Sequence, residues 1–277
     1  MPELPEIQAL AERLEQPLQG RVLRAIQPLS FTALKTVTPA YDVLIGRTLG
    51  ALSRRGKFLI FQFDGPRLLL HLAQGGRLDL EATPRSSRPK QGVVRLVFDD
   101  APTIYVKEFG TERKAAWWVL APQDDGPLAA LGPEPDSDDF AAFVLEGTDP
   151  RRIHTILRDQ RTVAGIGRGY ADDALHRAHL SPYATLRSLS SEQRASLLDA
   201  VGTTLTAALA QERQRTGGLP PKLGDRFTVH GRHGTPCPVC ASDLRRISYE
   251  SHEITYCPGC QTGGKVLADR RMSRLLR

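Results

Sequence analysis

The sequence has only four cysteines and no long apolar segment, and both facts narrow the class of protein. No run of apolar residues approaches the roughly 18 to 20 that are needed to cross a bilayer. The N-terminus also lacks a basic segment followed by an apolar core, which is the pattern of an export signal. We therefore expect a soluble, cytoplasmic protein, in a reducing environment that disfavours disulfide bonds.

Positive charge is missing from one stretch and concentrated in another. Residues 121–150 contain no Lys or Arg, whereas residues 213–277 contain 12 basic and 5 acidic residues. The net charge of +6 favours a polyanionic partner, although a basic surface can also be merely solvated. Because the acidic stretch is rich in Pro, Gly and Asp, its first half, residues 123–136, is interpreted as a linker between two domains.

The hydrophobic pattern differs on the two sides of this linker. Before it, short apolar or alternating runs predict antiparallel strands of a sandwich or barrel, at 21–29, 56–65, 66–75, 92–100, 103–109 and 115–121. Residues 3–16 instead have leucine or isoleucine at positions 4, 7, 10 and 14, a spacing that predicts a helix beginning at the chain terminus.

After the linker, helical patterns predict four helices, at 137–147, 150–160, 170–180 and 190–213. Serines at 137 and 190 are expected to cap two of them, the second in a capping box with Gln193. Residues 215–225 are interpreted as a flexible loop. The 277 residues thus form an α+β chain that is long enough for two domains with separate cores.

The four cysteines form a metal-binding pattern near the C-terminal end. They are spaced C-x2-C-x16-C-x2-C, so that two knuckles each present two thiolates: Cys237, Cys240, Cys257 and Cys260. Two disulfides or free thiols are the alternatives, and a reducing cytosol disfavours the first of these. We expect one structural zinc ion. Since four thiolates leave no open coordination position, the metal should fold a small β-hairpin and take no part in catalysis.

A glycine-rich turn lies between the second and third of the predicted helices. In AGIGRGYADDAL, Gly165, Gly167 and Gly169 allow a tight turn, and the helix that follows offers N–H groups and a positive dipole end to an anion. Arg168 adds a full charge at the same place. Taken alone, the motif is explained equally well by a plain glycine turn between packed helices.

Together these motifs resemble one family. The segments PELPEI, RRGKFLIF and AGIGRGYADDAL and the four-cysteine finger have the order and spacing found in the formamidopyrimidine-DNA glycosylase and endonuclease VIII family, which repairs oxidised bases. The resemblance implies an N-terminal helix on an antiparallel β-sandwich in 1–122, a helix-two-turn-helix domain in 137–230, and a β-hairpin zinc finger with a basic tail in 231–277. It also implies a monomer that binds double-stranded DNA in the cleft between the halves, at the bacterial nucleoid.

The resemblance further implies that the N-terminal proline is the nucleophile. Removal of the initiator Met would leave Pro2 with a free secondary amine, which can attack C1′ of the damaged nucleotide and form an iminium. A terminal amine has a reference pKa near ~8, so more of it is unprotonated at neutral pH than of a lysine. By resemblance, Glu3 moves protons at the sugar and Glu6 supports the terminus. Favourable charge at a helix N-terminus is the simpler interpretation of both glutamates.

Two further residues are expected on the DNA-binding surface. Lys57 matches the hairpin lysine of the family, whose implied role is to contact phosphate or the lesion, and Arg54 and Arg55 beside it favour an edge that faces phosphate. A surface turn residue is the alternative for this lysine. His71 in LLLHLAQGG is expected either to line the same cleft or to be a buried, satisfied histidine.

Some positions depart from the family's pattern. Arg168 stands where the family usually has Asn, and His252 stands where its finger usually has Arg. Gln74 replaces a Met that fills the space of the flipped base, and Arg113 and Lys114 in TERK take the place of an Arg-and-Phe wedge. Because no aromatic group is found in that segment, we expect weak, opposite-base-independent removal of 8-oxoguanine and better activity on other lesions.

The sequence therefore predicts a bifunctional DNA glycosylase and AP lyase that removes oxidised bases and cleaves the strand by β,δ-elimination. The alternative is a non-catalytic, zinc-dependent protein that binds DNA lesions with the same fold. Pro2, Glu3 and Lys57 argue against it, because a binding module does not need a free N-terminal proline. A nuclease that uses metal-bound water is disfavoured, because the one clear metal site is filled by thiolates.

Overall fold

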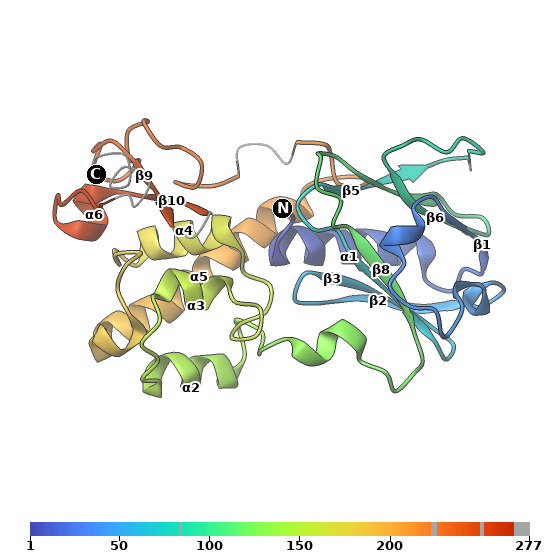
Figure 1. Ribbon diagram of the computed structural model, residues 1–277, viewed down its shortest axis with the longest axis horizontal. Helices are drawn as coiled ribbons and strands as arrows, with labels where there is room; N and C mark the ends of the chain where they lie inside the picture. The colour runs from blue at the N-terminus through green and yellow to red at the C-terminus, as the bar shows by residue number, and fades with distance from the viewer. Residues whose placement is uncertain (84, 223–225, 250–251, 269–277) are drawn as a thin grey trace. The chain divides into compact units, whose positions relative to one another are not determined.

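The computed structural model describes residues 1–83, 85–222, 226–249 and 252–268, and the chain divides into two compact units. Unit 1 contains Met1–Ala130 and Ala208–Gly224, and unit 2 contains Leu131–Ala207 and Asp225–Arg277. The strands between residues 23 and 120 belong to unit 1, whereas the helices between residues 138 and 177 and the hairpin of residues 245–256 belong to unit 2 (Figure 1). The chain is of the α+β class, as its patterning predicts.

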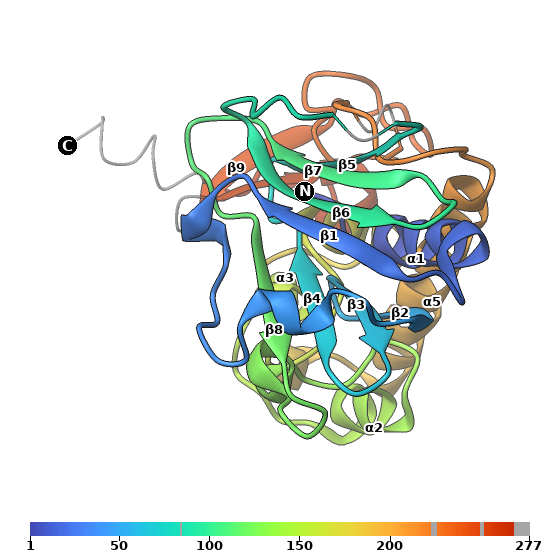
Figure 2. The same ribbon diagram turned by 90° about the vertical axis from the view of Figure 1, so that its right-hand side faces the viewer.

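Unit 1 contains two antiparallel four-stranded sheets, whose strands can be followed in Figure 2. The sheet orders are β1-β6-β7-β5 and β2-β3-β4-β8. The strands are β1 Leu23–Pro28, β2 Leu49–Arg55, β3 Phe58–Phe63, β4 Arg67–His71, β5 Gly76–Glu81, β6 Gly92–Phe98, β7 Thr103–Glu108 and β8 Ala116–Leu120. One apolar cluster takes side chains from both sheets, Phe61 and Leu96 among them, as expected for a sandwich.

Helix α1 (Leu4–Leu18) packs on β2 and β3 of unit 1. Its apolar positions, including Leu10 and Leu14, are fully buried in the same cluster as the two sheets. The helix extends two residues beyond the predicted end and includes Pro17 in its last turn. The chain then leaves the helix with the N–H of Gln19 donating to Glu15 O at 2.8 Å.

The segment after helix α5 (Ser191–Arg213) is held against β5 in unit 1. The Leu219 N–H donates to Leu78 O at 2.7 Å, and the Leu219 side chain is fully buried in the core. A Cβ at Gly218 would lie 1.9 Å from Leu78 O, so only glycine permits this close approach. The prediction of a flexible loop is therefore wrong at Gly218 and Leu219, which are fixed by backbone and core contacts.

Unit 2 contains the helices predicted after the linker and the finger. The helices are α2 Asp138–Glu146, α3 Ile153–Arg158, α4 Arg168–Arg177 and α5 Ser191–Arg213, the last of which ends in unit 1. The finger consists of β9 Arg245–Tyr249, β10 His252–Tyr256 and α6 Pro258–Thr262, with β9 and β10 paired antiparallel. The capping box at α5 is confirmed, since Gln193 N–H donates to Ser190 Oγ and Ser190 N–H donates to Gln193 Oε1. Among the helices of the described residues, none has both the length and the apolar character that a bilayer crossing requires.

Candidate active site and metal centre

Three buried residues surround the N-terminal end of α1. Pro2 is buried, Glu3 is the N-cap residue with 3% of its surface exposed, and Glu6 is fully buried. Glu6 Oε2 accepts a hydrogen bond from the Glu3 N–H at 2.7 Å, which is one half of a capping box. The sequence therefore places two carboxylates beside the second residue of the chain, and the fold removes both from bulk solvent.

Lys57 lies in the tight turn between β2 and β3, and it is buried, with 5% of its surface exposed. Arg54 connects this turn to α1. Its Nε donates to Oε1 of Gln8 in α1 at 2.9 Å, and its Nη1 donates to Gly56 O in the turn at 3.0 Å. Gly56 has φ of +56°, a conformation that favours glycine. Arg54 thus binds the backbone next to Lys57, a role that its place in the sequence does not reveal.

His71 ends β4 directly opposite Phe58 of β3. The two rings lie 4.7 Å apart between centroids. Burial and, to a smaller extent, the charge of Lys57 lower the pKa of His71 to about 4. His71 is therefore neutral at pH 7 and can donate or accept a hydrogen bond, but it brings no positive charge to a phosphate.

The residues proposed to fill the space of a flipped base lie in two loops of unit 1. Gln74 is exposed, and so are Arg113 and Lys114. Lys114 Nζ pairs with Glu112 at 2.6 Å, but both side chains are at least 70% exposed, so the pair contributes little to stability. The loop is instead shaped by buried Glu108, whose Oε1 accepts the N–H groups of Lys114 and Ala115.

An aromatic residue that the sequence pattern did not single out begins the second of these loops. The Phe109 N–H donates to Gly75 O at 2.9 Å, which places Phe109 next to the residue after Gln74. A Cβ at Gly75 would meet Phe109 O at 2.0 Å, so the contact requires glycine. The segment TERK itself has no aromatic group, as the sequence shows, but the hydrogen bond to Gly75 places Phe109 beside the loop of Gln74. The sequence contains the signal, since Phe109 and Gly110 directly precede the segment TERK.

An open pocket of about 590 Å³ lies in unit 1 beside β5. It is lined by Asp79 and Leu80 of β5 and by residues 214–220. Its backbone geometry depends on the close approach of Gly218 to Leu78 described above. The sequence pattern predicted a flexible loop at this place and therefore gave no indication of a pocket.

In unit 2, Gly167 is the N-cap residue of α4 and Arg168 is its first residue. The preceding turn is held by Gln160, whose Oε1 accepts from Gly165 N–H at 2.9 Å and whose Nε2 donates to Ile166 O at 2.7 Å. Gly165 has φ of +95°. The turn therefore has a fixed backbone, and it presents the N-terminus of a ten-residue helix with an arginine at its start.

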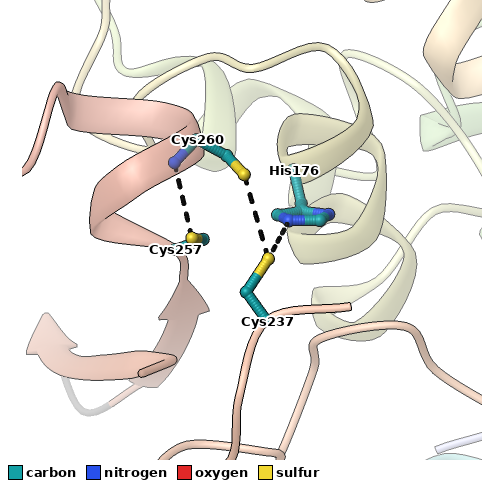
Figure 3. A group of neighbouring side chains, drawn as sticks. All are labelled: His176, Cys237, Cys257 and Cys260. Atoms are coloured by element: carbon teal, nitrogen blue, oxygen red, sulfur yellow. Dashed lines mark hydrogen bonds between the residues drawn. The ribbon is translucent and has the colours of Figure 1, made fainter. Parts of the chain in front are cut away.

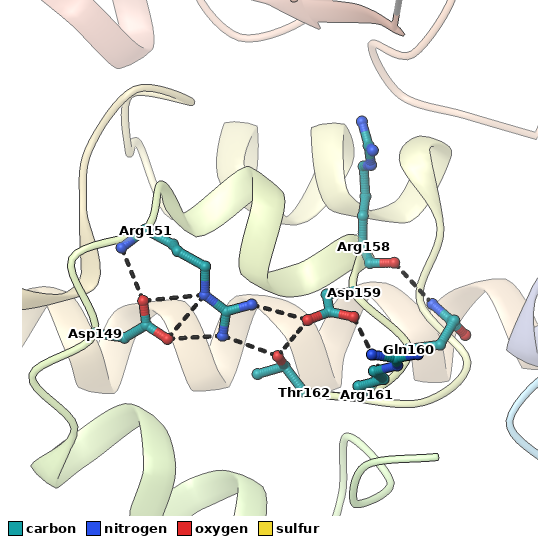
Figure 4. Close-up of polar contacts among 7 residues, drawn as sticks. All are labelled: Asp149, Arg151, Arg158, Asp159, Gln160, Arg161 and Thr162. Atoms are coloured by element: carbon teal, nitrogen blue, oxygen red, sulfur yellow. Dashed lines mark hydrogen bonds and ion pairs between the residues drawn. The ribbon is translucent and has the colours of Figure 1, made fainter. Parts of the chain in front are cut away.

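An ion-pair network holds the chain that leads into this turn (Figure 4). Arg151 Nη2 contacts Asp149 Oδ2 at 2.7 Å, and its Nη1 contacts Asp159 Oδ2 at 2.8 Å. Thr162 Oγ1 donates to the same Asp159 oxygen at 2.8 Å. These contacts lower the pKa of Asp149 and Asp159, with burial acting against them. The network joins the two ends of α3 directly before Gln160.

Two adjacent aspartates of α4 bind the finger and the segment directly before it in unit 2. Asp172 bonds to His154 Nε2 at 3.0 Å and to His230 Nδ1 at 2.6 Å, and it accepts the Thr255 N–H at 3.0 Å. Burial opposes its ionisation, but the bonds with the two histidines outweigh this effect and lower the pKa of Asp172. Asp173 accepts three successive N–H groups, those of residues 228–230. The finger is thus attached to the helix that begins at Arg168.

The four cysteines come together in unit 2. Cys237 Sγ lies 3.8 Å from Cys260 Sγ, and Cys240 Sγ lies 3.3 Å from Cys257 Sγ. Zinc–sulfur bonds of about 2.3 Å in a tetrahedron place sulfurs about 3.8 Å apart. The Cys237–Cys260 pair has this spacing and the Cys240–Cys257 pair is about 0.5 Å shorter, so the donor set is compatible with a zinc ion. His176 of α4 also lies within 4.8 Å of Cys237, Cys257 and Cys260, as Figure 3 shows. Sequence spacing gave no sign of this histidine.

The remaining predicted contact, His252, is the first residue of β10. Its side chain lies outside the described part of the structure, as do residues 269–277 of the predicted basic tail.

Comparison with known proteins gives the same family over most of the chain. Residues 1–111 match the model of the formamidopyrimidine-DNA glycosylase N-terminal domain, and residues 131–217 match the model of its H2TH domain. The formamidopyrimidine-DNA glycosylase of Thermus thermophilus is 33% identical over 276 residues, covering 95% of this chain and 100% of that protein. An uncharacterized formamidopyrimidine-DNA glycosylase-like protein of Mycobacterium tuberculosis is 43% identical over 152 residues, covering 53% of this chain and 95% of that protein.

Solved structures of the Lactococcus lactis glycosylase are also similar. One, bound non-covalently to DNA that contains an AP site, has a TM-score of 0.82 at 25% identity, covering 94% of this chain and 99% of that chain. A second, a mutant form in complex with DNA that contains Fapy-dG, has a TM-score of 0.82 at 26% identity, covering 94% of this chain and 100% of that chain.

Proposed function

Because the chain belongs to the formamidopyrimidine-DNA glycosylase family, we propose that it excises oxidised bases from double-stranded DNA and cleaves the strand through Pro2. The observation that carries this proposal is the buried end of α1. There, Glu6 holds the backbone of Glu3 at 2.7 Å, one residue from the amine that Met1 removal would expose. Activity on chromosomal DNA would place the protein in the cytoplasm.

In the proposed reaction, the Pro2 nitrogen forms a bond to C1′ of the damaged nucleotide, and the bond from C1′ to the base breaks. The base leaves with the electron pair of that bond and takes up a proton, and the Pro2 nitrogen loses its own proton. Glu3 protonates the sugar ring oxygen, which opens the ring and leaves an iminium between Pro2 and C1′. Loss of a proton from C2′ sends electrons into the iminium and expels the 3′ phosphate, and a second elimination expels the 5′ phosphate. Water then hydrolyses the remaining iminium, which releases the sugar fragment as an aldehyde and restores the Pro2 amine. The buried position of Glu3 supports its role in moving protons.

We assign the DNA backbone contacts to Lys57 in unit 1 and to Arg168 in unit 2. Arg168 combines a side-chain charge with the N-terminus of α4, which together favour a phosphate. His71 is neutral at pH 7, so its contribution would be a hydrogen bond or the support of Lys57. We also propose DNA contacts for three further residues: Arg113, Lys114 and His252.

The functional division that we propose is a catalytic domain in 1–122, a linker in 123–136, a helix-two-turn-helix domain in 137–230, and a finger with its tail in 231–277. Cys237, Cys240, Cys257 and Cys260 would hold one zinc ion in the finger. Bound zinc would supply folding energy and no reaction step, because four thiolates fill its coordination sphere.

Phe109 affects the substrate preference that we propose. Its position beside Gly75 supports a role for its ring, together with Gln74, in filling the space left by a flipped base. With an aromatic ring available beside Gln74, weak removal of 8-oxoguanine is no longer the expected outcome. We propose that both oxidised purines and oxidised pyrimidines are substrates.

The test is single-turnover excision from duplexes that contain 8-oxoguanine, a ring-opened purine, an oxidised pyrimidine or an abasic site, each opposite all four bases. The protein must first be shown by mass spectrometry to begin at Pro2. We expect base release and strand cleavage on several lesions, and we expect Glu3→Gln to bind the same duplexes with roughly 100-fold slower excision or more, as removal of a general acid predicts. Binding of these duplexes by wild type without any excision would contradict the proposal and favour a lesion-binding protein.

A further inference from the structure

We propose that His176 donates a hydrogen bond from Nε2–H to the Cys237 thiolate and thereby slows loss of the metal from the finger. The inference rests on the proposed zinc site. It assigns a function to a histidine that lies on α4, outside the C-x2-C-x16-C-x2-C pattern.

The geometry supports a direct contact. His176 Nε2 lies 3.2 Å from Cys237 Sγ, and each of the two residues has only 3% of its surface exposed. In Figure 3, the imidazole of His176 lies beside the sulfur of Cys237, and Cys260 approaches the same sulfur from the finger. A thiolate has no proton to donate, so the Nε2 nitrogen must carry the hydrogen of this bond.

Charge explains why such a donor would matter. A zinc ion with four thiolates carries a net charge of about −2, which is costly to bury without compensating hydrogen bonds. An N–H group directed at one sulfur reduces the charge on that sulfur and makes it harder to protonate or displace. Loss of such a partner of a metal ligand typically changes metal affinity by about 10- to 100-fold.

The structure allows this contact to be removed without detaching the finger. Asp172 of the same helix accepts the Thr255 N–H of β10, and Asp173 accepts the N–H groups of residues 228–230, directly before the finger. These bonds do not involve His176. A substitution at His176 should therefore affect the metal centre more than the docking of the finger.

A different role is also chemically open to His176, because it lies within 4.8 Å of three of the cysteine sulfurs and Cys240 is exposed. In that arrangement, His176 would be the fourth metal ligand in place of Cys240. Short sulfur–sulfur distances within both cysteine pairs favour the four-thiolate site, with His176 outside it.

The test compares zinc-loaded wild type with His176→Phe, His176→Gln and a control, His233→Phe. His233 is exposed in the same unit and is not among the clustered metal-binding groups, so the control makes the same change at a position outside the cluster. Zinc transfer to an excess of a chromogenic chelator gives the rate of metal loss. We expect His176→Phe to lose zinc about 10- to 100-fold faster, His176→Gln to lie closer to wild type because its amide can donate, and His233→Phe to match wild type. Circular dichroism before chelation checks that each variant is folded.

Replacing zinc with cobalt gives an absorption spectrum that reports on the metal ligands. This spectrum would not change if His176 had only a structural role. Removing an N–H donor from a coordinated thiolate should shift the sulfur-to-cobalt charge-transfer band of His176→Phe to lower energy, with the four-sulfur ligand-field pattern unchanged. A three-sulfur, one-nitrogen pattern in wild type that is lost in His176→Phe would make His176 a ligand and overturn the inference. Equal zinc-loss rates in wild type and in folded His176→Phe would also overturn it, while leaving the zinc site intact. Wild type without zinc would overturn both the inference and the proposed metal site.

Discussion

Replacing Glu6 tests how the N-terminal end of α1 is held. The Glu6 side chain is fully buried, and its Oε2 accepts the Glu3 N–H at 2.7 Å. In Glu6→Ala this acceptor is lost, and a hydrogen bond to a charged group contributes about 1.5 to 3 kcal/mol. In Glu6→Gln an amide oxygen of nearly the same size can still accept, so about half of that loss is expected.

The magnitude can be read from thermal unfolding. One kcal/mol shifts the melting temperature by about 2 to 4 °C for a protein of roughly 150 to 250 residues. Glu6→Ala should therefore melt roughly 3 to 12 °C below wild type, with Glu6→Gln in between. Glu146→Gln is the control, because Glu146 is exposed on α2 and its change should have a small effect.

The same variants connect stability to chemistry. If Glu6 holds Glu3 in place for catalysis, single-turnover cleavage at an abasic site should fall in the order wild type, Glu6→Gln, Glu6→Ala, at a temperature where all three remain folded. The reasoning would be refuted by a Glu6→Ala protein whose melting temperature and cleavage rate both equal those of the Glu146→Gln control.

Three further changes have expected outcomes. Gly218→Ala places a Cβ 1.9 Å from Leu78 O and should destabilise unit 1 by about 1 to 3 kcal/mol in denaturant unfolding, whereas Gly202→Ala, in an open part of α5, should stabilise by about 1 kcal/mol. Because the pKa of His71 falls from 6.5 to about 4 on folding, the folded state binds fewer protons between these pH values. The contribution of His71 to the free energy of unfolding should thus be fully present above about pH 6.5 and fall by up to about 3 kcal/mol towards pH 4. The variant His71→Asn should lose most of this pH dependence, as measured by chemical unfolding across the same pH range. Cys257→Ser should abolish stoichiometric zinc by metal analysis and weaken DNA binding in an electrophoretic shift assay, and a variant that keeps one zinc with full affinity would contradict the assignment.

The sequence predicted the fold where periodicity was strong and local. The helix over 3–16 and the strands around Phe61 and Leu96 were predicted because their apolar residues repeat at the period of a single element. Strand β2, LGALSRR, and strand β5, GRLDLE, were missed because glycines and charged residues interrupt their alternation. Their place in the sheets is set by pairing with β3 and β7, a long-range effect that a local pattern does not contain.

Contacts between distant segments explain what the sequence could not reveal about the site. The bond between His176 and Cys237 joins residues 61 positions apart, and the bond between Gln8 and Arg54 joins residues 46 positions apart. Neither pair has a spacing that indicates contact. The neutral state of His71 depends on burial beneath its strand neighbours, which composition does not show. Phe109 differs from these cases, because its signal was present in the sequence, directly before the segment to which the wedge was assigned.

The central claim is that the Pro2 amine forms a covalent bond with DNA, and reductive trapping tests it most directly. Protein that begins at Pro2 would be mixed with a duplex containing an abasic site in the presence of borohydride, and the adduct would be mapped by peptide mass spectrometry. We predict a stable crosslink between DNA and Pro2, strongly reduced in Pro2→Gly and in protein that retains Met1. Wild type that binds the duplex but gives no adduct, or an adduct mapped to Lys57, would contradict the claim.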